Sequence, residues 1–147
     1  MVQWQAGARN DPHFAHSDMP ATVQLDRKRG IRVTTITGVV RRDELLDAYA
    51  LIVGDPELSG ATRGLVDLRH GSVDELTTVD VQTYAHLPAL PRQSEMRLAV
   101  VATDPVAYGM SRMYAMFREN TLTGEAEVFH DYDLAVAWLL SNAGPPS

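Results

Sequence analysis

The sequence predicts an α/β fold in which a five-stranded mixed sheet carries four helices mainly on one face. Segments with strand and helix patterns alternate in the order ββαβαβαβα, which favours parallel strands joined by right-handed crossovers after one antiparallel first strand. The strands alternate polar and apolar residues, whereas parallel strands covered on both faces form continuous apolar runs. A chain of 147 residues is one domain in length. We expect the domain to span residues 21–141, with tails at 1–20 and 142–147.

The first two strands are predicted to form a β-hairpin. The segments Thr22 to Asp26 and Ile31 to Thr37 each alternate polar and apolar residues, and Gly30 lies in the turn between them. Gly38 ends the second strand.

An amphipathic helix is predicted from Arg42 to Val53, because its apolar residues form one stripe. Asp55-Pro56 ends this helix. Residues 57–63 are expected to form a polar loop, and Gly64 to Arg69 a short buried strand.

The helix after this strand begins near one of two pairs with capping-box spacing, either Ser72 and Glu75 or Thr77 and Asp80. It is expected to end near Pro88.

The last four elements are two strands, each followed by a helix. Thr103 or Asp104 can cap the first of these helices, and Asp131 can cap the second. The predicted ranges are a strand from Met96 to Ala102, a helix from Pro105 to about Asn120, a strand from Glu125 to His130, and a final helix after Asp131.

One face of the sheet is expected to be only half apolar. We assign to it the polar residues Thr22, Gln24, Arg32, Thr34, Asp67, Arg69, Arg97 and Glu127. Such a face would be partly open, or covered by the tail or by a partner subunit. The alternative is a sheet covered on both faces, with Asp67 and Arg69 buried as a pair.

Composition excludes several classes of function. The chain has no cysteine, which excludes disulfides, thiol catalysis and cysteine-bound zinc. Its net charge of −6 argues against nonspecific nucleic-acid binding. No apolar run reaches the roughly 20 residues of a membrane span, and the first twenty residues contain no signal-peptide pattern. We therefore expect a cytoplasmic protein without stable membrane insertion.

The N-terminal tail contains two large aromatic residues, Trp4 and Phe14. Large aromatics usually dock on an apolar surface, and a homodimer is one way to provide it. His13 and His16 could form a metal clip, but a plain acidic, histidine-containing tail is the favoured interpretation, and we predict no metal site.

A candidate site lies at the rim where the carboxyl ends of three strands converge, because open α/β sheets usually bind ligands there. The predicted ligand-binding residues are Arg69, Ser72, Thr103, Asp104, Tyr108 and Arg112. The start of the helix from Pro105 offers free N–H groups that favour an anion. Arg112 could bind that anion or pair with Glu119 or Asp104.

No residue set in the chain forms a convincing catalytic group. His70 and His130 could act as acid–base groups, but histidines at strand ends also serve as surface or capping residues. Ser72 is not part of a nucleophile elbow, and no phosphate-binding or dinucleotide-binding motif is present. We predict no catalytic residue and no cofactor.

Three stretches of the chain carry a family resemblance: GVVRRDELLDAYALIVGDPELSGATRGLVDLRHGSV, LAVVATDPVAYGMSRMYAMF and EVFHDYDLAVAWL. They resemble the SpoIIAA-like family of small bacterial proteins, which is related in fold to STAS domains and to the lipid-carrying domain of CRAL-TRIO proteins. The resemblance covers about residues 21–141. It implies a (βα) superhelix with sequential strand order.

The resemblance implies two kinds of function. STAS domains of the anti-sigma-antagonist type switch protein partners when a serine at the start of the helix after the third strand is phosphorylated. The matching region here has no serine, and Thr77 or Thr78 could substitute. The lipid carriers imply a buried apolar ligand instead.

We expect a non-enzymatic STAS-like binding or regulatory module that binds a protein partner or a small anionic ligand at the rim. The alternative is a small carrier of a lipid-like or amphipathic anion. Its head group would lie at the helix start and Arg112, and its tail against Met110 and Met113.

Overall fold

The computed structural model describes residues 20–119 and 124–141. The elements, in chain order, are β1 (Ala21–Asp26), β2 (Ile31–Val39), α3 (Arg42–Gly54), α4 (Pro56–Ser59), β3 (Arg63–Ser72), α5 (Thr78–Ala85), the 3-10 turn η2 (Gln93–Glu95), β4 (Arg97–Val101), α6 (Pro105–Glu119), β5 (Glu125–Phe129) and α7 (Tyr132–Leu140). The predicted tails, and with them Trp4, Phe14 and the two tail histidines, lie outside the described residues apart from Pro20.

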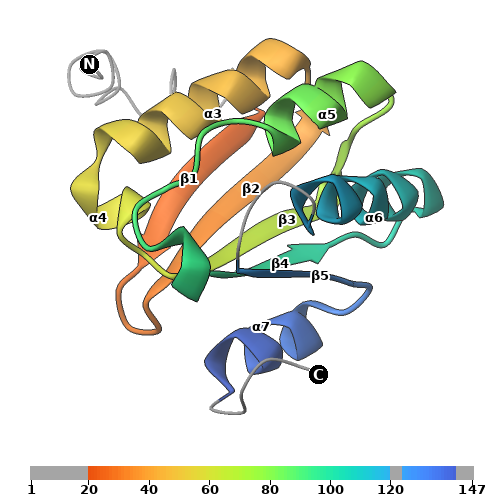
Figure 1. Cartoon of the computed structure of the whole chain (residues 1–147). Coiled ribbons are helices and arrows are strands. Elements are labelled where there is room, and N and C mark those ends of the chain that lie inside the picture. The colour runs from red at the N-terminus through yellow and green to blue at the C-terminus, as the bar shows by residue number, and fades with distance from the viewer. Residues whose placement is uncertain (1–19, 120–123, 142–147) are drawn as a thin grey trace, which may run out of the picture.

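The five strands form one mixed sheet in the order β1-β2-β3-β4-β5 (Figure 1). β1 pairs with β2 in the antiparallel direction, and the remaining neighbours are parallel. This arrangement confirms the predicted α/β class and the sequential strand order.

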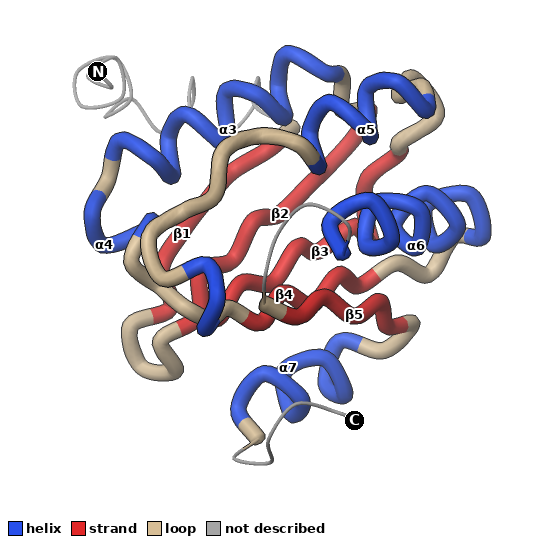
Figure 2. The backbone as a smooth tube through the Cα atoms, in the orientation of Figure 1, coloured by secondary structure: helices blue, strands red, loops and turns tan. Residues whose placement is uncertain are grey.

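The helices cover the two faces of the sheet unequally. α3, α5 and α6 lie over one face, while α7 lies on the other, against β3, β4 and β5 (Figures 1 and 2). Right-handed crossovers between strands in sequential order place every crossover helix on the same face, which explains the asymmetry. We call the face beneath α3, α5 and α6 the covered face and the other the α7 face.

The hairpin register corrects the predicted assignment of residues to faces. Thr22 and Gln24 of β1 lie opposite Thr35 and Val33 of β2. Because neighbours across a ladder point to the same side of a sheet, these four residues share the α7 face. Arg32 therefore points to the covered face.

Thr34 follows the same rule, since it lies opposite Val23, which packs against the core of the covered face. The prediction that Arg32 and Thr34 share a face with Thr22 and Gln24 is wrong. Alternation within one strand shows which of its residues share a face. It does not show which residues of the neighbouring strand lie on that same face, because this depends on the register between the strands.

Three helix starts follow their predicted caps. In α5, Thr77 Oγ1 accepts a hydrogen bond from the Asp80 N–H (3.1 Å), and Asp80 Oδ2 accepts one from the Thr77 N–H (2.9 Å). In α6, Asp104 Oδ2 accepts from the Ala107 N–H (3.0 Å), and in α7, Asp131 Oδ1 accepts from the Leu134 N–H (2.9 Å).

Two local expectations need correction. The segment predicted as a polar loop begins with the short helix α4, because Asp55 Oδ1 accepts from the Glu57 N–H (2.9 Å) and Pro56 fits the first helical position. β3 continues to Ser72, because residues beyond Arg69 still pair with β2 after a register shift. Ser72 therefore ends a strand and does not begin a helix.

We predict that Thr77→Ala lowers the free energy of unfolding by about 1 kcal/mol, because it removes the cap of α5. Thr78→Ala is the matched control and should change stability by less than about 0.5 kcal/mol, since the exposed Thr78 side chain makes no hydrogen bond with the described residues. Urea denaturation of both variants measures the difference. Equal losses would show that the cap does not stabilise α5.

Candidate functional site

The predicted rim residues make mainly local contacts. Asp104 caps α6 through the N–H groups of Val106 (3.1 Å) and Ala107 (3.0 Å), so its own carboxylate occupies the helix start that was expected to bind an anion. Ser72 Oγ accepts from the Asp74 N–H (3.2 Å). Thr103 is exposed.

Tyr108 and Arg112 lie on α6 but have different surroundings. The Tyr108 ring stacks on the His130 ring, with centroids 3.9 Å apart and planes inclined by 9°. Arg112 is exposed and forms no ion pair with Glu119 or Asp104. Ligand binding at the rim therefore stays a prediction.

Arg69 forms an ion pair with Asp67 on the α7 face. The guanidinium donates from Nε to Oδ1 (3.0 Å) and from Nη2 to Oδ2 (2.9 Å), and it lies 4.2 Å above the centroid of the Tyr132 ring. Asp67 is buried, whereas the Arg69 side chain is 36% exposed. Of the two residues that the alternative expected to be buried as a pair, only Asp67 is buried.

The Asp67 carboxylate is stabilised in its charged form. Burial favours the neutral acid, but the hydrogen bonds from the Arg69 side chain and backbone outweigh it and lower the pKa of Asp67. Because Arg69 pairs with Asp67 and also contacts Tyr132, it connects β3 to α7 and has a structural role.

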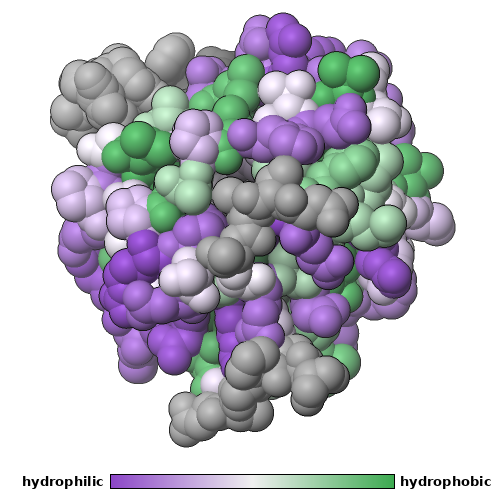
Figure 3. Space-filling view, in the orientation of Figure 1, coloured by the Kyte–Doolittle hydropathy of each residue, from purple (hydrophilic) through white to green (hydrophobic). Residues whose placement is uncertain are grey.

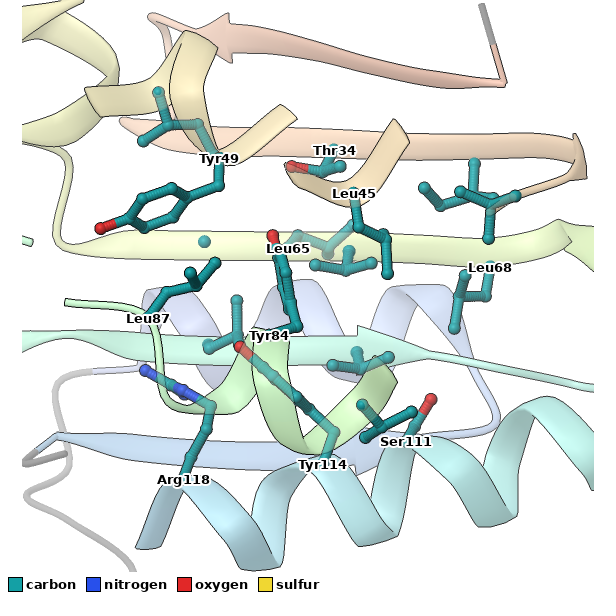
Figure 4. Close-up of a pocket in the computed structure, with 18 of the residues that line it drawn as sticks. Thr34, Leu45, Tyr49, Leu65, Leu68, Tyr84, Leu87, Ser111, Tyr114 and Arg118 are labelled. Atoms are coloured by element: carbon teal, nitrogen blue, oxygen red, sulfur yellow. The ribbon is translucent and has the colours of Figure 1, made fainter. Parts of the chain in front are cut away.

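A cavity of about 150 Å³ lies between the covered face of the sheet and α3, α5 and α6 (Figure 4). A single water needs only about 10–15 Å³ of such space, so the cavity is large enough for a small organic molecule. Most of its lining is aliphatic: Ile36, Val40, Leu45, Ile52, Leu65, Val66, Leu68, Val73, Leu76, Val81, Leu87, Leu90, Leu98 and Val100. Met96 and Met110 add flexible thioether side chains.

The cavity reaches the surface beside the segment that follows α5. Its lining there includes the exposed Pro88. The Tyr49 hydroxyl donates to the Pro88 carbonyl (2.8 Å), which ties α3 to this segment. Figure 3 shows hydrophobic residues among α3, α5 and α6, and hydrophilic residues over the β1–β2 turn.

Polar groups gather at one end of the cavity, near the amino ends of β2, β3 and β4. They come from Arg32 on β2, Tyr84 on α5, and Tyr114 and Arg118 on α6. The rings of Tyr84 and Tyr114 have centroids 5.7 Å apart. Arg118 Cζ lies 5.7 Å from the centroid of the Tyr114 ring. This polar end lies at the amino ends of the strands, whereas the predicted rim lies at their carboxyl ends.

Arg32 reaches this end because Gly64 leaves room for it. The two residues are neighbours across the β2–β3 ladder. A Cβ atom on Gly64 would come within 2.9 Å of Arg32 Nη2 and 3.1 Å of Leu98 Cδ1, both closer than real Cβ atoms normally lie. A glycine at this position therefore keeps the guanidinium inside.

Burial changes the acidity of these groups. Loss of water on burial lowers the pKa of Arg32. Tyr84 and Tyr114 act to raise this pKa, whereas the positive charge of Arg118 lowers it further. Burial likewise raises the pKa of Tyr84 and of Tyr114, against the pull of the two arginines. Both phenols stay protonated at neutral pH and present O–H donors.

The similarity of this chain to known proteins lies in its fold. No protein-family model matches the chain, and no curated protein matches it. Among solved structures, it is similar to an uncharacterised DUF3478-family protein from Shewanella loihica PV-4, which is described as having a SpoIIAA-like fold. The two are 17% identical, the match covers 81% of this chain and 91% of the other, and the TM-score is 0.50.

The chain has a SpoIIAA-like fold. The fold that the sequence resemblance implies is confirmed. At this level of identity the likeness extends to the SpoIIAA-like fold alone.

Within residues 20–119 and 124–141, no cluster of three or more His, Asp or Glu side chains is placed to hold a metal ion. In the same part of the chain, no helix is long and apolar enough to cross a membrane.

Sequence reasoning missed the polar end of the cavity. It grouped Arg32 with the open face, and it gave no role to Gly64 or Arg118. A polar residue flanked by Ile31 and Val33 is an available signal, but only the cross-strand register shows that Arg32 lies beneath the helices. Met110 lines the cavity as the carrier alternative expected, whereas Met113 does not.

We predict that Asp67→Asn removes a contribution to stability that depends on pH. Because the folded pKa of Asp67 is depressed, its contribution is present above the unfolded value of about 3.9 and is lost as pH falls through the folded value. The difference in unfolding free energy between wild type and variant should therefore shrink as pH falls from about 5 towards 2.

Glu127→Gln is the matched control, because this exposed carboxylate lies on the same face of the sheet and forms no ion pair with the described residues. Chemical denaturation over a pH series measures both variants. A stability difference for Asp67→Asn that stays constant across the series would contradict the prediction.

Proposed function

We propose that this protein is a non-enzymatic binding module that holds a small, largely apolar molecule in the cavity beneath α3, α5 and α6. The cavity itself carries the proposal, since about 150 Å³ of space is lined mainly by aliphatic side chains with a few polar groups at one end. Small-molecule sites in proteins have this composition. Close-packed interiors leave few voids larger than one water.

The chemistry of the lining supports binding without reaction. Ser111 is buried in the cavity wall and carries a hydroxyl, which is a candidate nucleophile. That hydroxyl donates to the Ala107 carbonyl of its own helix (2.7 Å), and among the described residues that line the cavity there is no His, Asp or Glu to act as its base. The tyrosine hydroxyls are held protonated by burial. These groups are suited to holding a ligand.

The partner-switching alternative has weaker support. A closed core would favour a module that acts only through its surface, whereas this core contains a cavity that reaches the surface. Thr77 is exposed, but its hydroxyl caps α5.

We predict that Leu45→Trp weakens binding of the neutral dye N-phenylnaphthylamine about tenfold or more, because an indole at this position in α3 would fill the cavity. The dye fluoresces when it leaves water, so a fluorescence titration measures its affinity. Leu134→Trp is the control: it places the same indole on α7, at a position 63% exposed.

Wild type and Leu134→Trp should bind the dye alike. Circular dichroism checks that Leu45→Trp is folded. The proposal would fail if wild type bound no dye, or if Leu45→Trp bound it as tightly as the control.

A further inference from the structure

Arg32 is a positive charge buried beneath three helices. Arg32 as a whole residue is only 4% exposed. In the described part of the chain, no carboxylate lies within ion-pair distance of it. Burial of an ion that lacks an opposite charge is unfavourable, so a counter-charge from outside the chain would stabilise this group.

The guanidinium is only partly satisfied by the fold. Nη1 donates to the Leu58 carbonyl (2.9 Å) and makes a longer contact with the Ala61 carbonyl (3.4 Å). Among the described residues, neither Nε nor Nη2 of Arg32 has a hydrogen-bond acceptor. Nη2 lies beside Gly64, which also lines the cavity.

Arg118 brings a second positive charge to the same end of the cavity. It is 6% exposed and extends from the last turn of α6. In Figure 4, Arg118 and Tyr114 both extend from α6 towards Leu87. The positive charge of Arg118 acts to lower the pKa of Arg32 further.

Two neutral donors complete the set. Within the described residues, neither the Tyr84 nor the Tyr114 hydroxyl has a hydrogen-bond partner, and both side chains line the cavity. Buried tyrosine hydroxyls usually find an acceptor. The Arg32 guanidinium and the two phenols therefore offer hydrogen-bond donors to one negatively charged group, beside the positive charge of Arg118.

We infer that the polar end of the cavity binds the carboxylate of an amphipathic organic acid, with Arg32 as the main partner and the apolar tail of the acid along the aliphatic lining. A planar guanidinium matches a carboxylate in shape and charge. The tail would lie against side chains such as Val40, Leu45, Leu68, Val100 and Met110. This inference rests on the proposed binding function and narrows its ligand to acids.

The test compares decanoic acid with 1-decanol, which has the same tail and no charge at neutral pH. Each compound competes with N-phenylnaphthylamine on the wild-type protein. We expect the acid to compete about tenfold or more better than the alcohol. Arg32→Met keeps the length of the side chain without the charge, and it should bring the acid-to-alcohol ratio close to one.

Arg42→Met is the matched control, because it removes the same charge from an exposed position on α3 that lies outside the cavity lining. It should leave the ratio at the wild-type value. An equal loss in Arg42→Met would show that the preference comes from the overall charge of the protein, and would overturn the inference.

The outcomes separate the inference from the proposed function. If wild type binds the dye and both compounds equally, the cavity binds ligands but the acid preference is wrong. If wild type binds none of them, the proposed function itself fails. If Arg32→Met does not fold, the wild-type ratio still decides the acid preference, and Tyr84→Phe, which removes one donor, should lower that ratio.

Discussion

The burial of the Arg32 guanidinium on the covered face of the sheet is the constraint on which the surrounding structure depends. Core clusters on either side of it are aliphatic, and a single charge among them is costly. A hydrogen bond from Arg32 Nη1 to the Leu58 carbonyl (2.9 Å) offsets part of this cost. The fold also leaves a glycine at position 64, where a side chain would press on the guanidinium. The cavity lies beside Arg32, which forms part of its lining.

The location of the cavity follows from the strand order. In doubly wound sheets, the order reverses and ligands bind at the crevice where it does so, at the carboxyl ends of the strands. The order β1-β2-β3-β4-β5 contains no reversal, so this sheet lacks the topological feature that places a ligand crevice at the carboxyl ends of the strands. The helices instead pack in a row over one face (Figure 1), and the space lies between that row and the sheet.

Much of the fold could be predicted from the sequence, because its signals are local. The caps at Thr77, Asp104 and Asp131 depend on residues two to three positions away. Alternation between strands and helices determines the parallel pairing and the crossover direction. The α4 helix was missed because the Asp55-Pro56 pair that ends one helix also begins the next.

The candidate site could not be predicted to the same extent, because it depends on contacts between distant segments. The face on which Arg32 lies is set by pairing with β1. The room for its guanidinium is set by Gly64, and the second charge comes from Arg118 at the far end of α6. Reasoning from strand ends indicated the carboxyl edge of the sheet, whereas these groups meet at the amino edge.

Methyl NMR of methionine-labelled protein tests most directly whether the cavity is the ligand site. Met96 and Met110 line the cavity, whereas Met116 is 61% exposed and lies outside it. On titration with decanoic acid, the methyl signals of Met96 and Met110 should shift and saturate together while that of Met116 stays in place. Shifts confined to Met116, or unchanged signals at Met96 and Met110, would contradict it.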